Sequence, residues 1–255
     1  MILLLFKTFK TLYKQGLIMK QWELEKLMRD ISVWAHPDHL LEQYYTPADI
    51  AAHIMFIANN DGNIEDRHIV DLGCGGGILG FGALFCGAKK VTFVDVSDES
   101  ISTLKENLKH FDLVEGDNDG QEIEIIQLDI GEEITKESYL DISIPSCDTV
   151  IMNPPFGCYR KGIDTIFLSI ATIITSSSPH GAVYSLHKSS TRSYLIKRVC
   201  GWARGHGRLT ILGQFKYPLE RKYKFHKKDE KEIEVDLIFI KASSFSPKNI
   251  WAKTR

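Results

Sequence analysis

Apolar and polar positions repeat along the chain with two periods, one typical of strands and one typical of helices. Short apolar runs predict buried strands over 68–72, 91–95, 123–129, 149–152, 182–186, 209–215 and 233–240. Apolar residues near the helical period predict helices over 22–33, 46–58, 78–86, 97–110, 164–175 and 191–202. Strands that alternate with helices predict an α/β fold, with helices on both faces of a mostly parallel sheet.

Two of the predicted helices have clear start signals. Thr46 is suited to an N-cap, Pro47 to the first helical position and Asp49 to the acid of a capping box. Ser97 is expected to cap the helix that follows the second strand.

The amino-acid composition indicates which class of protein this is. The chain has 255 residues, of which 44% are hydrophobic and 25% charged, as in a soluble globular domain. No run approaches the roughly 20 apolar residues of a membrane span, so no membrane is expected. The five cysteines are scattered without paired spacing, which argues against a zinc site or a disulfide framework and favours a reducing intracellular compartment. We expect no bound metal and one domain over 19–245, followed by a tail over 246–255.

The first eighteen residues differ from the rest. They contain three lysines, no acidic residue and the apolar opening Ile2-Leu3-Leu4-Leu5-Phe6. The absence of arginine argues against a mitochondrial presequence, although that alternative stays open. We interpret residues 1–18 as a disordered extension.

Charge is unevenly distributed, although the net charge is only -2. Residues 112–141 contain eleven acids and one base, whereas 216–228 contain six bases and one acid. The basic run is interleaved with Tyr217, Tyr223 and Phe225. Cations contact phosphates and aromatic rings stack on unpaired bases, so the run predicts an RNA-binding loop, with a solvated surface as the alternative.

A glycine-rich turn follows the first predicted strand. It reads Asp71-Leu72-Gly73-Cys74-Gly75-Gly76-Gly77 and precedes a predicted helix. Glycines there allow the backbone to approach a ligand closely. Asp95 ends the second strand, where a carboxylate can accept hydrogen bonds from ribose hydroxyls. Asp129, at the end of the third strand, is a candidate for the adenine amine or for a helix cap. The pattern predicts an adenosyl cofactor, and Gly75-x-Gly77-x-x-Gly80 leaves a dinucleotide as the alternative.

The tetrapeptide Asn153-Pro154-Pro155-Phe156 directly follows the fourth strand. Its two prolines specify a rigid, extended loop. An amide or adenine nitrogen is a poor nucleophile, because its lone pair is spread into a π-system. The Asn153 side-chain oxygen and the Pro154 carbonyl can accept its two N–H bonds and turn the lone pair towards a methyl donor. Phe156 can stack on a base. The tetrapeptide favours methyl transfer over dinucleotide chemistry.

Longer segments carry a resemblance to a known family. Leu41-Glu42-Gln43-Tyr44, Ile151 to Gly157, Val183 to Arg192, and Tyr223 to Lys228 with Ile233 to Leu237 occur in that order. They closely resemble the methyltransferase-like protein five family, the small-subunit rRNA adenine-N6 methyltransferases within the class I amino-methyltransferases. The resemblance covers roughly residues 19–240.

The resemblance implies a Rossmann-like, seven-stranded sheet whose last strand is antiparallel. It also implies N6-methylation of one adenosine in small-subunit (18S) ribosomal RNA with S-adenosyl-L-methionine as the methyl donor. The implied partners are ribosomal RNA and a small zinc-binding activator subunit that forms a heterodimer with the enzyme. The implied location is the nucleus, nucleolus and cytoplasm.

The motifs and the resemblance together define the expected site. The expected cofactor-binding residues are Gln43, Thr46, Asp71, Gly73, Gly75, Gly76, Ile78, Asp95, Asp129 and Asn153. The expected catalytic residues are Asn153, Pro154, Pro155 and Phe156. The expected RNA contacts are Lys188, Arg192, Lys224, Phe225, His226, Lys227 and Lys228. Gln43 has a structural alternative in holding its own loop, and His187 is expected to be a structural or phosphate contact.

Two other functions are alternatives to RNA methylation. A protein-glutamine N5-methyltransferase shares the planar-nitrogen problem and this type of tetrapeptide, but it does not account for the basic aromatic run. A cofactor-binding scaffold without turnover has no need of a clamp for an amine. We therefore expect an enzyme whose substrate is RNA.

Overall fold

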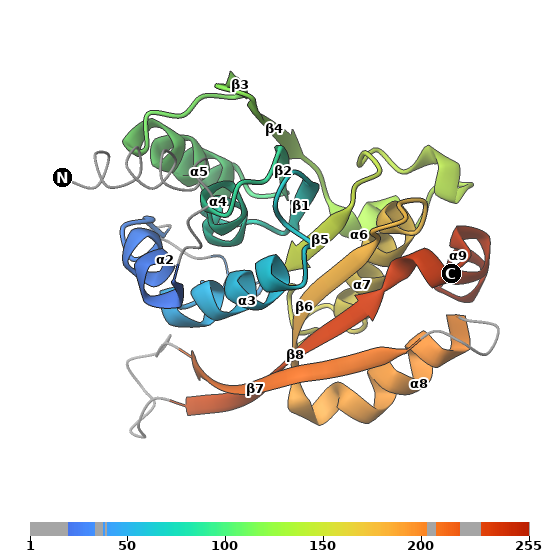
Figure 1. Ribbon diagram of the computed structural model, residues 1–255. Coiled ribbons are helices and arrows are strands. Elements are labelled where there is room, and N and C mark those ends of the chain that lie inside the picture. The colour runs from blue at the N-terminus through green and yellow to red at the C-terminus, as the bar shows by residue number, and fades with distance from the viewer. Residues whose placement is uncertain (1–19, 34–37, 39, 203–207, 220–230, 255) are drawn as a thin grey trace.

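In the part of the chain that the structure describes, eight strands form a single mixed sheet. Their bounds are β1 His68–Leu72, β2 Lys90–Asp95, β3 Gly116–Asn118, β4 Gln121–Gln127, β5 Thr149–Met152, β6 Ala182–Lys188, β7 Leu209–Leu219 and β8 Lys231–Lys241. The computed structural model describes residues 20–33, 38, 40–202, 208–219 and 231–254. The sheet has the order β3-β4-β2-β1-β5-β6-β8-β7 and crosses the middle of the molecule (Figure 1).

The sheet is parallel at its centre and antiparallel at both edges. From β4 through β2, β1 and β5 to β6 every neighbouring pair is parallel. At one edge β8 runs antiparallel to both β6 and β7. All seven predicted strands are therefore present, and the last strand in the chain is antiparallel as expected.

The sheet has one strand more than the seven expected. β3 pairs with β4 in an antiparallel hairpin. Asp119 and Gly120 lie between the two strands with φ of 55° and 89°. Asp-Gly is a residue pair favoured in two-residue hairpin turns, where both residues need positive φ. This hairpin therefore extends the sheet by a strand.

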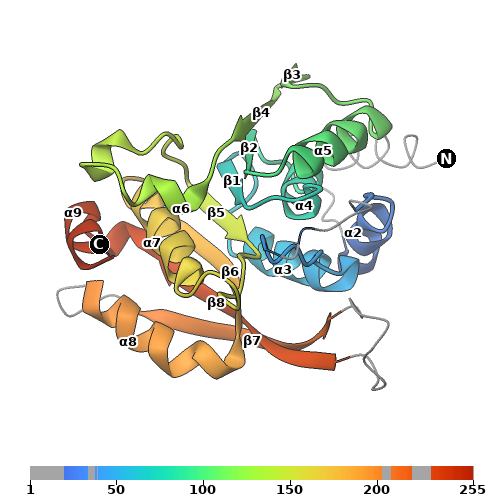
Figure 2. The same ribbon diagram turned by 180° about the vertical axis from the view of Figure 1, so that it is seen from behind.

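The helices cover both faces of the sheet. They are α2 Gln21–Met28, α3 Ala48–Asn60, α4 Ile78–Phe85, α5 Asp98–His110, α6 Ile130–Glu133, α7 Ile163–Thr175, α8 Arg192–Trp202 and α9 Pro247–Thr254. Helices α2 to α5 pack on one face and α6 to α9 on the other (Figure 2). Successive strand residues such as Ile69 and Val70 are buried in opposite cores, as the alternation of side chains in a strand requires.

Several boundaries differ from those predicted. Helix α2 ends at Met28 rather than Val33, and Trp22, the first residue of the predicted helix, is 60% exposed. The predicted tail over 246–255 contains α9, whose Ile250 is buried and which packs against α7. The extension over 1–18 and most of the basic run lie outside the described residues. None of the described helices combines the length and apolar character that a membrane span requires.

Candidate active site

The parallel strands bring the predicted cofactor residues to one edge of the sheet. β4, β2, β1 and β5 are neighbours and end on the same side. Asp95 ends β2, Asp129 follows β4 after one residue, and Asn153 directly follows β5. Parallel α/β sheets bind ligands beyond the carboxyl ends of their strands, where chain connections leave a crevice.

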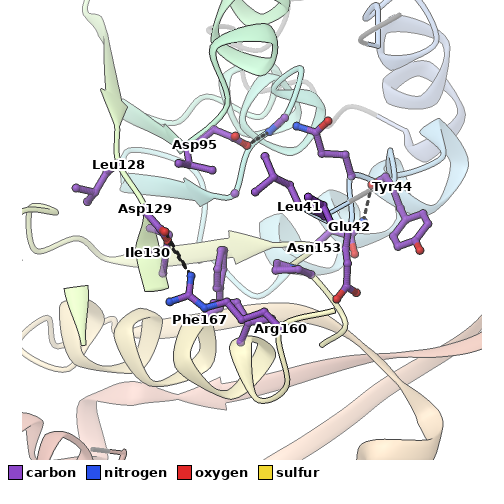
Figure 3. Close-up of a pocket in the computed structure, with 17 residues that line it drawn as sticks. Leu41, Glu42, Tyr44, Asp95, Leu128, Asp129, Ile130, Asn153, Arg160 and Phe167 are labelled. Atoms are coloured by element: carbon purple, nitrogen blue, oxygen red, sulfur yellow. Dashed lines mark hydrogen bonds and ion pairs between the residues drawn. The ribbon is translucent and has the colours of Figure 1, made fainter. Parts of the chain in front are cut away.

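A cavity with about 780 Å³ of empty space, open to solvent, lies at this edge (Figure 3). Six of the expected cofactor-binding residues line it, namely Gln43, Gly73, Gly75, Asp95, Asp129 and Asn153. The other four, Thr46, Asp71, Gly76 and Ile78, line a smaller hollow that shares Gly73, Gly75 and Asn153 with the cavity. Folding thus gathers all ten in one region.

The glycine turn is held against Asp95. Gly73, Gly75 and Gly77 have φ of 75°, 55° and 89°, a region that favours glycine. The Gly75 N–H donates to Asp95 Oδ2 at 2.8 Å, and the Ser97 N–H donates to Oδ1 at 2.9 Å. Burial raises the pKa of Asp95, and these N–H bonds limit the rise. Ser97 also caps α5 through the Ser100 N–H, as predicted.

Asp71 lies behind the turn and anchors α4. Its Oδ2 accepts the Gly80 N–H at 2.8 Å, and its Oδ1 is buried without a hydrogen-bond partner among the described residues. Burial raises its pKa to about 7, although the Gly80 N–H lowers it. A Cβ at Gly80 would lie 2.2 Å from the Phe93 ring, so this glycine is needed for packing of helix on strand.

Asp129 acts as the helix cap that was its structural alternative. Its Oδ1 accepts the Gly131 N–H at 2.7 Å at the start of α6. The Arg160 guanidinium also lies 3.3 Å from Oδ2 (Figure 3). Arg160 also lines the cavity, although no sequence motif predicted it as a site residue. A contact between Asp129 and an adenine amine stays a prediction.

Gln43 supports its own loop while it lines the cavity. Its Oε1 accepts the Asp38 N–H at 2.6 Å, and its Nε2 donates to Ser100 Oγ at 3.2 Å. The structural alternative for Gln43 is therefore confirmed. A direct contact with a cofactor stays a prediction.

The Asn153 amide is oriented by three groups from two separate segments, residues 44–46 and β7. Its Nδ2 donates to the Tyr217 hydroxyl at 2.7 Å, to Thr46 Oγ1 at 3.1 Å and to the Tyr44 carbonyl at 3.3 Å. Its Oδ1 is buried without a hydrogen-bond partner among the described residues. Buried polar atoms are nearly always paired, so this oxygen is available for a bound ligand.

Thr46 does not cap α3. That helix begins at Ala48 with Pro47 at the N-cap position and without a capping hydrogen bond from a side chain. The Thr46 hydroxyl instead accepts from Asn153. The tertiary contact with the tetrapeptide thus replaces the local capping role that the sequence predicted.

Phe156 is mostly enclosed by other side chains. The ring is 6% exposed, and it lies parallel to the Tyr44 ring at 6.0 Å and edge-on to the Tyr217 ring at 6.1 Å. Lys188 Nζ lies 5.5 Å from its centroid. Stacking of this ring on a base stays a prediction, and it requires these neighbours to open a face of the ring.

Two further residues of the site have roles that the sequence did not predict. Tyr217 was expected among the RNA-stacking aromatics, but it is fully buried in β7 and bonded to Asn153. Glu42 is buried with φ of 51°, accepts the Tyr159 N–H at 2.8 Å through Oε1 and lines the cavity. A non-glycine residue held in this backbone region is uncommon and is found at functional sites. Glu42 lies in the segment Leu41 to Tyr44 and Tyr217 in the basic run, but no local pattern predicted these contacts.

The predicted RNA contacts separate into three groups. Arg192 forms a bidentate pair with buried Asp236, with both N···O distances at 2.7 Å, and contact of Arg192 with RNA stays a prediction. Lys188 is half-buried beside Phe156 and donates to Cys158 Sγ at 2.6 Å. The remaining five, Lys224, Phe225, His226, Lys227 and Lys228, lie outside the described residues.

His187 is a structural residue, one of the two roles predicted for it. It is 1% exposed, and its Nε2 lies 2.8 Å from Ser185 Oγ. Burial lowers its pKa to about 3, so the ring is neutral at physiological pH. A neutral, buried imidazole is not suited to contact a phosphate.

Sequence comparison finds methyltransferases similar to this chain. The methyltransferase small domain family matches residues 46–180. The rRNA N(6)-adenosine-methyltransferase METTL5 of Danio rerio is 35% identical over 225 residues, covering 86% of this chain and 98% of the relative. Mettl5 of Drosophila melanogaster, also an rRNA N(6)-adenosine-methyltransferase, is 36% identical over 223 residues, covering 86% of this chain and 94% of the relative.

Solved structures share the fold. A Pyrococcus horikoshii protein described as a candidate RNA methyltransferase has a TM-score of 0.68 at 30% identity, covering 88% of this chain and 97% of its own. The branched-chain polyamine synthase of Thermus thermophilus, solved with 5'-methylthioadenosine, has a TM-score of 0.61 at 12% identity, covering 84% and 61% of the two chains. The α/β fold prediction is confirmed, and the family match favours methyl transfer over dinucleotide chemistry.

Proposed function

The chain belongs to the METTL5 family of rRNA N6-adenosine methyltransferases, and from this membership we propose that it methylates N6 of an adenosine in small-subunit (18S) ribosomal RNA. The observation that carries the proposal is the Asn153 amide. Its nitrogen is held by three acceptors while its buried oxygen has no partner among the described residues. That is the arrangement needed to accept an N–H bond from an exocyclic amine.

The residues present fit S-adenosyl-L-methionine. Positive-φ glycines at 73 and 75 bring the backbone close to the cavity, and Asp95 lies beside them for ribose hydroxyls. The expected contacts Gln43, Asp129 and Asn153 line the same cavity. When bound, this cofactor supplies an electrophilic methyl group on a sulfonium. Asn153 therefore lies at the junction of the cofactor site and the acceptor site.

Catalysis on this surface is mainly placement. The Asn153 oxygen and the Pro154 carbonyl accept the two N–H bonds of the adenine amine and so fix the direction of its lone pair. No strong base is needed, because the methylated nitrogen is more acidic and loses its proton after transfer. Pro155 lines the cavity and restricts the loop that carries both acceptors.

The partners proposed are RNA and an activator subunit. Lys188 and the basic residues Lys224, Lys227 and Lys228 are the proposed phosphate contacts. A small zinc-binding activator is proposed to form a heterodimer with the enzyme. Co-expression with such a subunit should increase the yield of soluble enzyme, and gel filtration should recover the two chains together.

The first test is transfer of a labelled methyl group from S-adenosyl-L-methionine. The purified enzyme, with its activator, is incubated with small-subunit rRNA from cells that lack the enzyme. Label in N6-methyladenosine supports the proposal. Label only on a protein with a glutamine acceptor favours N5-methylation, and label on neither substrate identifies a scaffold without turnover.

The role of Asn153 is tested separately by Asn153→Ala. We expect loss of turnover with cofactor affinity largely kept, because the amide clamps the acceptor. Asn118→Ala is the control: this amide bonds within its own β3 hairpin, away from the cavity. Near-normal methyl transfer by Asn153→Ala would exclude the proposed clamp.

A further inference from the structure

We infer that Tyr217 is a positioning residue for Asn153: its hydroxyl oxygen binds the amide nitrogen and keeps the amide oxygen available to the methyl acceptor. The inference rests on the proposed function for the role of the Asn153 oxygen, and it adds a residue that lies 64 positions away on another strand. Tyr217 is fully buried in β7 and lies outside the tetrapeptide and the glycine turn.

The hydrogen bonds of Tyr217 specify which way the Asn153 amide points. A hydroxyl can donate and accept, so by itself it does not distinguish an amide nitrogen from an amide oxygen. The Tyr217 proton, however, is donated to the Tyr45 carbonyl at 2.7 Å, and a carbonyl can only accept. The Tyr217 oxygen must therefore act as the acceptor towards Asn153, and only Nδ2 can donate to it.

The other two partners of Asn153 are weaker constraints. The Tyr44 carbonyl can only accept, but it lies 3.3 Å from Nδ2, near the limit of a hydrogen bond. Thr46 Oγ1, at 3.1 Å, belongs to a hydroxyl that can face either end of an amide. The Tyr217 hydroxyl is the shortest contact and one of the two groups that require the nitrogen.

The environment keeps this hydroxyl in place and protonated. Burial raises the pKa of Tyr217 above its ordinary value, so the hydroxyl keeps its proton at neutral pH. The Tyr217 ring also packs edge-on against Phe156, with centroids 6.1 Å apart and an interplanar angle of 82°. Tyr217 thus contacts the tetrapeptide at both its first and last residues.

Tyr217→Phe tests this arrangement while it keeps the ring. Without the hydroxyl, the amide can rotate so that Oδ1 accepts from the Thr46 hydroxyl, which withdraws the oxygen from the acceptor. Losing the hydrogen bond that orients the amide should lower kcat by about tenfold. KM for S-adenosyl-L-methionine should change little, because the substitution removes no side chain that lines the cofactor cavity.

Tyr184→Phe is a matched control. Tyr184 is also fully buried, and its hydroxyl accepts from Asn63 Nδ2 at 2.8 Å and donates to Asp61 Oδ2 at 2.7 Å. These partners follow the C-terminal end of α3, whereas Thr46 precedes its N-terminal end. The control removes a hydroxyl with the same burial and the same donor and acceptor pattern from a place outside the site.

A second readout does not depend on turnover. The side-chain NH₂ signals of Asn153 are identified in a ¹H–¹⁵N spectrum by their loss in Asn153→Ala. A proton donated to a buried hydroxyl should be shifted and protected from exchange. Tyr217→Phe should move this signal and speed its exchange, and Tyr184→Phe should leave it unchanged.

The inference is supported by lower kcat at constant KM together with a displaced Asn153 signal in Tyr217→Phe alone. It is overturned by normal kcat in that variant, by an equal loss in Tyr184→Phe, or by an unchanged Asn153 signal. Failure of the proposed function is distinguishable: the wild type then labels no RNA, while the amide signal still reports whether Tyr217 holds Asn153.

Discussion

The guanidinium of Arg192 and the carboxylate of Asp236 form two parallel hydrogen bonds, each of 2.7 Å. Asp236 is 1% exposed and also accepts from Ser189 Oγ at 2.6 Å. Burial alone would raise the pKa of Asp236, but the bonds from Arg192 and Ser189 outweigh it and hold the pKa below its ordinary value. The pair joins α8 to β8.

Arg192→Ala is therefore expected to act on stability rather than on RNA binding. It leaves a buried carboxylate without its cation, a change that is strongly destabilising. Thermal melting should shift down by several degrees, while the salt dependence of RNA binding by the folded variant stays close to that of the wild type. An unchanged melting temperature with a flatter salt dependence would show that Arg192 contacts RNA after all.

Replacing Lys224, Lys227 and Lys228 with neutral residues should weaken RNA binding. If all three meet phosphates of unpaired RNA, the slope of log affinity against log salt should fall by about 2, since each contact releases about 0.7 of a counterion. Filter binding at several salt concentrations measures the slope. The control replaces Lys89, Lys105 and Lys109, which are exposed elsewhere. Equal slopes in the two variants would dismiss the basic run as an RNA contact.

Asp71 should make folding stability depend on pH. Its pKa in the folded state is about 7 because of burial, against about 4 for an exposed aspartate. Between these values the folded state holds a proton that the unfolded state has released. The contribution of Asp71 to the free energy of unfolding is therefore greatest below about pH 4. It falls as pH rises and reaches its minimum above about pH 7.

Asp71→Asn should remove this contribution, because an amide does not ionise. Urea unfolding at several pH values between 4 and 8 measures the slope, with exposed Asp119→Asn as the control. We expect a smaller loss of stability with rising pH in Asp71→Asn alone. The same slope as in the wild type would show that Asp71 ionises normally.

Arg160 should compete with the cofactor for Asp129. The Arg160 guanidinium lies 3.3 Å from Asp129 Oδ2 at the cavity, where the adenine amine is predicted to bind. Arg160→Ala removes this competitor. Since exposed ion pairs contribute at most about 1 kcal/mol, the Kd for S-adenosyl-L-methionine should fall by up to about fivefold. Calorimetry measures the Kd. Weaker binding would instead make Arg160 a cofactor contact.

The sequence alone determined the fold class and the location of the site. Buried strands are short apolar runs whose residue types do not depend on distant partners, so all seven predicted strands are found. The glycine turn and the Asn-Pro-Pro-Phe tetrapeptide carry their own backbone requirements. For that reason they were recognisable without knowledge of the neighbouring strands.

Tertiary structure decided the partners of the polar side chains. Thr46 reads locally as a helix cap and Tyr217 as an RNA-stacking ring, and no local pattern pairs Arg192 with a carboxylate. Pairing of β7 with β8 and the return of residues 40–46 beside β5 instead bring Thr46 and Tyr217 to Asn153, and Arg192 to Asp236. Most buried polar groups are hydrogen-bonded, and here the fold supplies these partners from positions far away in the chain.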